Sequence, residues 1–170
     1  LKTDQFDLAE RTLNKAAADR PNDPRIAVNL GTLYRTKGDF EQAISSVRKA
    51  LAIDPNLIDA LVSLGELEAI MGNERAASEA FEKVVEARPG NPAALIGLAK
   101  ISTTKREFER ALELLQKASS KARKGRVELA RGELELRRYS SEEAIRQLEI
   151  AVKAMPSDPM THALLGDALA

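Results

Sequence analysis

Apolar side chains along the chain follow the period of an α-helix. In the stretch 24–37 they lie at positions i, i+3, i+4 and i+7, which form one face of a helix, and the stretch 40–53 repeats this spacing. Gly38 interrupts the first stretch, and Pro55 ends the second because proline cannot continue a helix. The stretch 24–57 therefore predicts a helical hairpin. Its expected buried faces are Ala27, Leu30, Gly31 and Tyr34 in the first helix and Phe40, Ala43, Val47 and Ala50 in the second.

The hairpin pattern recurs along the chain at a nearly constant spacing. An alanine of the second helix returns after 34, 34, 34 and 33 residues, and a bulky apolar residue four positions later keeps the same intervals. Self-similarity at such a period is the signature of a repeat architecture. The two rows are Ala9, Ala43, Ala77, Ala111 and Ala144, and Leu13, Val47, Phe81, Leu115 and Leu148.

This period divides the chain into four complete hairpins and two halves. Residues 1–23 supply only a second helix and residues 159–170 only a first helix, which gives about ten helices in all. Stacked repeats bury their faces against their neighbours, so the halves predict an array that continues in a longer parent chain. The complete hairpins span 24–57, 58–91, 92–124 and 125–158, the last being divergent, and the whole of 1–170 is expected to be one array.

Several helix starts are marked by a capping residue followed by proline. The side chain of an Asp or Asn at the N-cap can accept a hydrogen bond, and proline suits the first helical position because its missing N–H is not needed there. These pairs predict three helix N-termini, at Asp23-Pro24, Asn91-Pro92 and Asp158-Pro159.

The divergent hairpin 125–158 carries two unusual features. Glu128 and Arg131 stand at normally apolar positions, so we expect the burying side chains of its first helix to be Leu129, Leu134 and Leu136. Gly125 and the basic tract 121–124 predict the capped C-terminus of the preceding helix.

The order of landmarks in 24–57 resembles the tetratricopeptide repeat, a helix–turn–helix unit of 34 residues. The resemblance implies an all-α fold, a right-handed α-solenoid or superhelix of stacked antiparallel hairpins, whose first helices form a concave wall that binds protein or peptide partners. Small residues are expected to face the alanines of the second helices, and so to let the two helices of each hairpin approach closely, at Gly31, Gly65, Ala99, Gly132 and Gly166. The landmarks themselves are Leu30, Gly31, Tyr34, Gly38, Ala43, Val47, Ala50 and Pro55.

Composition argues against several functional classes. The chain has 26 basic and 26 acidic residues, so no net field would attract nucleic acid. There is no cysteine, and His162 is the only histidine, for which we expect a partly buried packing role. We therefore expect no catalysis, no cofactor and no metal site. No uncharged run approaches 18 residues, so direct membrane insertion is not expected, and cytoplasm and periplasm are equally compatible.

The face of each first helix that points away from its partner helix is the candidate binding surface. Repeat positions 2, 5, 9 and 12 share this face at 100° per residue, and the resemblance implies that it lines the concave groove. Position 5 is apolar throughout, which fits either a partner-binding stripe or packing between neighbouring first helices. The candidate residues are Arg25, Val28, Thr32, Arg35, Asp59, Val62, Glu66, Ala93, Ile96, Lys100, Arg126, Leu129, Glu133 and Leu136.

The sequence favours a non-catalytic scaffold that binds a peptide or helix of a partner protein in this groove, within a multi-component assembly. Two alternatives stay open. The array could be the targeting or substrate-recruiting segment of a larger enzyme such as a glycosyltransferase, or a self-assembly module that associates through its terminal half repeats.

Overall fold

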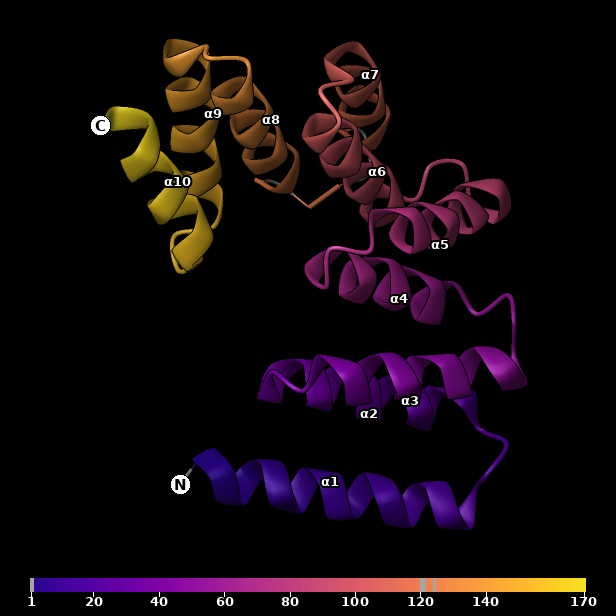
Figure 1. The fold of residues 1–170 in the computed structure, drawn as a ribbon. Helices are drawn as coiled ribbons and strands as arrows, with labels where there is room; N and C mark the ends of the chain where they lie inside the picture. The colour runs from indigo at the N-terminus through magenta and orange to yellow at the C-terminus, as the bar shows by residue number, and fades with distance from the viewer. Residues whose placement is uncertain (1, 120–121, 124) are drawn as a thin grey trace. The chain divides into compact units, whose positions relative to one another are not determined.

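The computed structural model describes residues 2–119, 122, 123 and 125–170, and all regular secondary structure in this part of the chain is α-helical (Figure 1). It contains ten helices and no strand, which confirms the predicted all-α helical solenoid. The helices are α1 (Lys2–Asp19), α2 (Pro24–Lys37), α3 (Phe40–Ile53), α4 (Ile58–Ile70), α5 (Glu74–Ala87), α6 (Pro92–Thr104), α7 (Phe108–Ser119), α8 (Arg126–Arg137), α9 (Ser141–Ala154) and α10 (Pro159–Leu169).

The helices fall into two compact units, each of which is described by itself. Unit 1 is Leu1–Val84 and unit 2 is Val85–Ala170. Consecutive helices pack as antiparallel hairpins within each unit, as α2 and α3 do in unit 1 and α8 and α9 in unit 2 (Figure 1). That the whole of 1–170 forms one continuous array stays a prediction.

Side-chain caps fix the three predicted helix starts. The carboxylate of Asp23 accepts from the backbone N–H of Arg25 (3.1 Å), and the Asn91 side chain accepts from the N–H of Ala94 (3.1 Å). The carboxylate of Asp158 likewise accepts from the backbone N–H of Thr161 (3.3 Å). Each cap satisfies an N–H that has no partner inside the helix, so the prediction from the Asp/Asn-Pro pairs is confirmed.

The turn inside every complete hairpin has one backbone geometry. A residue with positive φ follows the first helix, and the next N–H donates to a carbonyl five residues earlier at 2.8–2.9 Å, which is the Schellman arrangement. Glycine occupies the positive-φ position in two turns, Gly38 (φ 85°) and Gly72 (φ 79°). Arg106 (φ 62°) and Tyr139 (φ 61°) adopt it in the other two, where a side chain makes the left-handed region costly.

The core of unit 1 lies among α2, α3 and α4, both within a hairpin and between neighbouring hairpins. Ala43, Val47 and Ala50 of α3 are fully buried, and Ala60 and Leu67 of α4 pack with them. The small residues allow this close packing: a Cβ on Gly31 would lie 2.7 Å from Val47 Cγ2, and one on Gly65 would lie 2.5 Å from the ring of Phe81. The glycines therefore face the bulky row of the second helix rather than its alanines.

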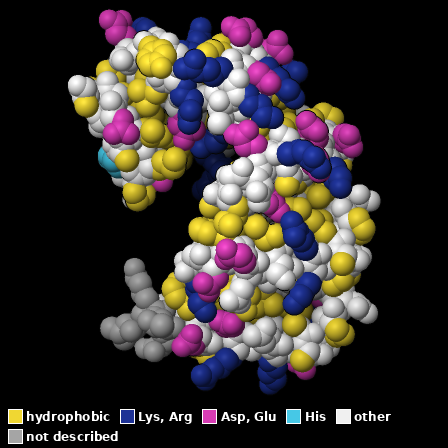
Figure 2. Space-filling model, viewed as in Figure 1, with side chains coloured by type: hydrophobic (Ala, Val, Ile, Leu, Met, Phe, Trp, Pro, Cys, Tyr) yellow, Lys and Arg dark blue, Asp and Glu magenta, His cyan; other side chains and the backbone are white. Residues whose placement is uncertain are grey.

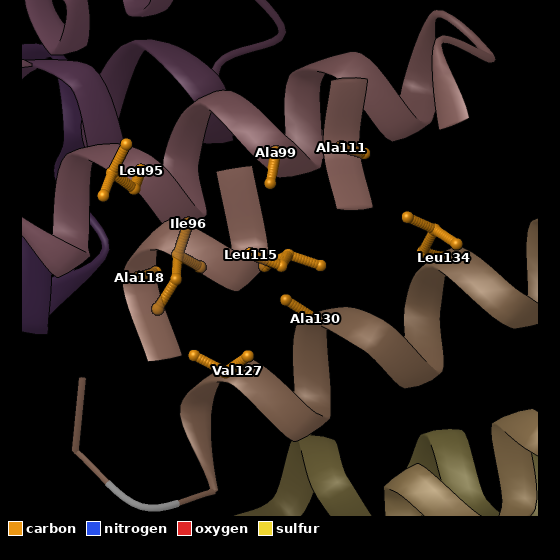
Figure 3. Packing of buried hydrophobic residues seen from close by; sticks show 9 residues of the cluster. All are labelled: Leu95, Ile96, Ala99, Ala111, Leu115, Ala118, Val127, Ala130 and Leu134. Carbon is orange, nitrogen blue, oxygen red and sulfur yellow. The ribbon is translucent and has the colours of Figure 1, made fainter. Parts of the chain in front are cut away.

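The core of unit 2 joins three helices. Aliphatic side chains of α6 and α7 meet those of α8 in one cluster (Figure 3). A second cluster forms around Leu148 of α9, and a Cβ on Gly132 would lie 2.5 Å from Leu148 Cγ. Members of the first cluster are Leu95, Ile96, Ala99, Ala111, Leu115, Ala118, Val127, Ala130 and Leu134.

Two expectations for the divergent hairpin are wrong. The deeply buried apolar residues of α8 are Val127, Ala130 and Leu134, and only Leu134 among them is a predicted one. The other two predicted residues, Leu129 and Leu136, are only half-buried. The three buried residues lie at i, i+3 and i+7, so the side of α8 that faces the core differs from the side that carries Leu129 and Leu136.

Gly125 caps the start of α8 rather than the end of α7, because α7 ends at Ser119. The N–H of Gly125 donates to the carboxylate of Glu128 (2.9 Å), which explains an acidic residue at a position that is apolar in the other complete hairpins. Lys121 and Lys124 of the basic tract lie outside the described residues.

Candidate functional site

In unit 1 the candidate surface comprises the faces of α2 and α4, two helices that contact one another. Arg35 at the end of α2 donates to the carboxylate of Glu66 on α4 (Nη1–Oε2 2.8 Å). Val28 and Val62 are both half-buried, and Val28 packs against the apolar cluster of the unit. The structure thus brings Arg35 and Glu66 together in an ion pair that joins neighbouring first helices.

The remaining candidates of unit 1 are exposed and lie near the helix starts or in the third turn of α2. Arg25 forms two hydrogen bonds with the carboxylate of Asp23 (2.9 and 3.0 Å), which raises the pKa of Arg25 and lowers that of Asp23. The Thr32 hydroxyl donates to its own helix, at Val28 O (3.2 Å). Asp59 is exposed in the first turn of α4.

In unit 2 the same kind of ion pair joins α6 to α8. The Lys100 ammonium donates to Glu133 Oε1 at 3.0 Å, and both residues are half-buried. Ala93 is half-buried at the start of α6, and Arg126 is exposed at the start of α8. Leu129 and Leu136 are half-buried and pack against the cluster around α9 and α10.

Ile96 is the one candidate that the structure places in the core. It is only 5% exposed and belongs to the apolar cluster of α6, α7 and α8, where it lies near Val127 (Figure 3). Neighbouring first helices pack closely enough here to cover it. For Ile96 the packing alternative applies, so an apolar surface in unit 2 would have to use Leu129 and Leu136.

The sequence pattern missed a row of polar residues on the inner side of the first helices. Glu68 is 2% exposed, and its carboxylate accepts from Arg48 Nη2 (2.8 Å) and from Asn73 Nδ2 (2.8 Å). Glu68 stands where the first complete hairpin has Tyr34, and Ser102 and Glu135 are the buried equivalents in unit 2. The signal in the sequence was a polar residue at an expected aromatic position.

Tyr34 links its hairpin to α1 in a similar way. Its hydroxyl donates to Glu10 Oε1 (2.9 Å), and Lys37 donates to the other oxygen (2.8 Å). The hydrogen bonds from Lys37 and Tyr34 lower the pKa of Glu10, whereas burial and the nearby carboxylate raise the pKa of Tyr34. These contacts hold α1 to α2 and are structural in character.

No arrangement typical of catalysis stands out in the described part of the chain. His162 is exposed, contrary to the expected partly buried position, and its Nε2 lies 2.9 Å from the carbonyl oxygen of Pro156. Among the described residues no group of three or more His, Cys, Asp or Glu could hold a metal ion, and no helix is both long and apolar enough to cross a membrane. Figure 2 shows acidic and basic side chains interspersed with hydrophobic ones on the viewed face.

The chain consists of antiparallel helical hairpins that share the Schellman turn, and in them a small residue of the first helix packs against a bulky side chain of the second. These features define an α-solenoid repeat protein. Two family models, both described as Tetratricopeptide repeat, match residues 1–58 and 69–134. The chain is therefore a tetratricopeptide-repeat (TPR) protein, and its fold is that of a scaffold for protein–protein interaction. Comparison with curated proteins gives no match.

Solved structures of TPR proteins share the fold at low sequence identity. A thermophilic TPR protein of Thermus thermophilus is 17% identical with a TM-score of 0.81, over 99% of this chain and 92% of that one. A chain of the APC/C hetero-tetramer Cut9-Hcn1 is 17% identical with a TM-score of 0.84, over 97% and 33% respectively. YrrB, described as a TPR protein with an unusual peptide-binding site, is 20% identical with a TM-score of 0.67, over 94% and 83%.

Proposed function

We propose that the chain is a non-catalytic scaffold that binds a peptide or helix of a partner protein along the first-helix faces, within a multi-component assembly. The observation that carries the proposal is the pairing of charges between neighbouring first helices. Arg35–Glu66 in unit 1 and Lys100–Glu133 in unit 2 join oppositely charged members of the candidate surface.

The pairing indicates which kind of partner the surface would take. Charges that are already paired with one another attract a charged partner only weakly, whereas the half-buried aliphatic side chains keep part of their surface exposed to solvent. Val28 and Val62 lie on the same face as the Arg35–Glu66 pair, one on each helix. A partner segment with apolar anchors at helical spacing, rather than a strongly charged tail, suits such a surface.

Two of the similar structures support this proposal. YrrB is described as having a peptide-binding site, and the Cut9-Hcn1 structure is a hetero-tetramer. Both are similar to this chain in fold, and both associate with other polypeptides.

A displayed library of amphipathic helical peptides provides the test. Peptides selected on the chain would be measured against Thr32→Glu, which adds a charge at an exposed position of α2, and against Val62→Glu on α4. We expect each substitution to weaken binding at least tenfold, or about 1.4 kcal/mol. Gln42→Glu, on the exposed side of α3, is the matched control and should leave the dissociation constant unchanged.

If all three substitutions weaken peptide binding equally, or if none of them weakens it, the first-helix faces are excluded as the binding surface. Failure to select any peptide would also count against the proposal. Circular dichroism of the variants separates lost binding from lost folding, which matters most for half-buried Val62.

A further inference from the structure

Two turns of unit 2 carry large side chains where the equivalent turns of unit 1 carry glycine. Arg106 and Tyr139 adopt positive φ, 62° and 61°, at the positions that Gly38 and Gly72 occupy in unit 1. A bulky side chain makes this backbone conformation less favourable, so glycine would give a more stable turn. Both side chains are exposed, Tyr139 by 84%, so burial of the side chain does not offset this cost.

The two turns lie side by side and present these side chains together. Arg106 Nη2 lies 3.5 Å from the hydroxyl oxygen of Tyr139, a contact between the α6–α7 turn and the α8–α9 turn. A second contact joins the same segments, since the Arg138 guanidinium lies over the ring of Phe108, 6.0 Å from its centre. Arginine and tyrosine are among the residue types most enriched where proteins bind one another tightly. Their retention at unfavourable backbone positions therefore points to a role outside the fold.

Positive charge gathers at the same two turns. Lys105, Arg106 and Arg137 are exposed, and none of them forms an ion pair with a residue that the structure describes. The equivalent stretches of unit 1, 36–39 and 70–73, contain a single cation, Lys37, and its ammonium pairs with Glu10. The dipoles of α6 and α8 favour cations at the ends of these helices, but they do not require a side chain at a left-handed position.

We propose that this edge of unit 2, formed by Lys105, Arg106, Arg137 and Tyr139, is a docking site for a short acidic segment of a partner protein. The site lies at the turns and does not depend on the first-helix faces. Charge complementarity specifies the occupant, because a guanidinium group binds a carboxylate through two parallel hydrogen bonds and a cluster of cations attracts several carboxylates. The Tyr139 ring supplies an apolar contact beside these charges.

Acidic residues near the turns limit the length of the segment. The first turn of α7 carries Glu109, and the first turn of α9 carries Glu142 and Glu143. These carboxylates would repel a long polyanion such as nucleic acid, whereas a segment with a few carboxylates can bind to the cations alone. The surface therefore favours an acidic peptide.

Fluorescence anisotropy with a labelled oligoglutamate peptide and the 170-residue chain provides the test. We expect saturable binding that weakens as the salt concentration rises, because the cations are exposed. A double variant, Arg106→Gly with Tyr139→Gly, should raise the dissociation constant about tenfold or more. The same variant should melt at a higher temperature than the parent chain, because glycine suits the positive φ of both turns.

Lys153→Gln is the matched control, because it also removes one exposed cation of unit 2 but lies in the last turn of α9, at the opposite end from the α8–α9 turn. It should leave the dissociation constant unchanged. A gain in stability together with a loss of binding identifies a docking role, whereas a lower melting temperature of the double variant would show that the side chains serve the fold and would overturn the proposal.

The peptide measurements can overturn the proposal in three further ways. The first is a lack of saturable binding to oligoglutamate, and the second is equal weakening by Lys153→Gln and the double variant. The third is tighter binding of a single-stranded oligodeoxythymidylate of equal charge, which would assign the surface to nucleic acid.

Discussion

Replacing Gly65 by alanine places a methyl group against a buried aromatic ring. The new Cβ would lie 2.5 Å from Phe81 Cε1 and 2.7 Å from two further ring atoms, all well inside van der Waals contact. Phe81 is only 1% exposed, so its ring cannot move aside without displacing other core atoms. Overpacking of this kind costs about 1–3 kcal/mol, which outweighs the roughly 1 kcal/mol by which alanine exceeds glycine in helix propensity.

Gly166→Ala is the matched control, because it makes the same substitution at the same repeat position where no described atom lies within 4 Å. Only the difference in helix propensity acts there, so we expect the substitution to stabilise the chain by up to about 1 kcal/mol. The two variants should therefore move the midpoint of urea unfolding in opposite directions. Circular dichroism measures both under identical conditions.

A compensating substitution sharpens the test. The third complete hairpin combines alanine at this position with leucine opposite, as Ala99 and Leu115, and both are buried. Adding Phe81→Leu to Gly65→Ala reproduces that pair, so the double variant should be more stable than the sum of the single effects predicts. Strict additivity, or a Gly65→Ala variant as stable as the parent chain, would refute the close-packing argument.

Three further predictions concern the turns, the link to α1 and a helix cap. Tyr139→Gly should stabilise the chain by about 1 kcal/mol in urea unfolding, because the tyrosine is 84% exposed and its positive φ suits glycine; a loss of stability would show that its side chain matters more than its backbone. The pKa of Glu10 is lowered in the folded chain, so the stabilisation that its carboxylate provides is fully present above the ordinary pKa of 4.5 and is lost as the pH falls through the lower pKa of the folded chain. Melting temperatures measured between about pH 6 and 3 should therefore drop less for Glu10→Gln than for the parent chain. Asn91→Ala should cost about 1 kcal/mol by removing the cap of α6, whereas Asn91→Asp should preserve it, as thermal melts can verify.

Helix positions and ends were available from the sequence because they depend on local chemistry. Hydrophobic spacing gives the face of each helix, and Asp23 and Asn91 mark helix starts through hydrogen bonds to residues two and three positions away. The glycines at positions 38 and 72 likewise mark turns, and their alignment with Arg106 and Tyr139 could have indicated the same backbone there.

The candidate surface depended on distances between helices that no local pattern contains. The sequence placed Ile96 and Val62 in equivalent positions, yet Ile96 is buried because α6 and α8 lie close together. Charged residues 31 and 33 positions apart pair as Arg35–Glu66 and Lys100–Glu133, which requires side chains on neighbouring first helices to meet.

The sequence by itself thus determined a repeat of helical hairpins, since its period, breakers and caps act over a few residues at a time. Tertiary structure decided which side of α8 is buried and how far each candidate side chain is exposed. The physical reason is that a helical face is wide enough to accommodate several packing angles, and only the neighbouring helix selects one of them.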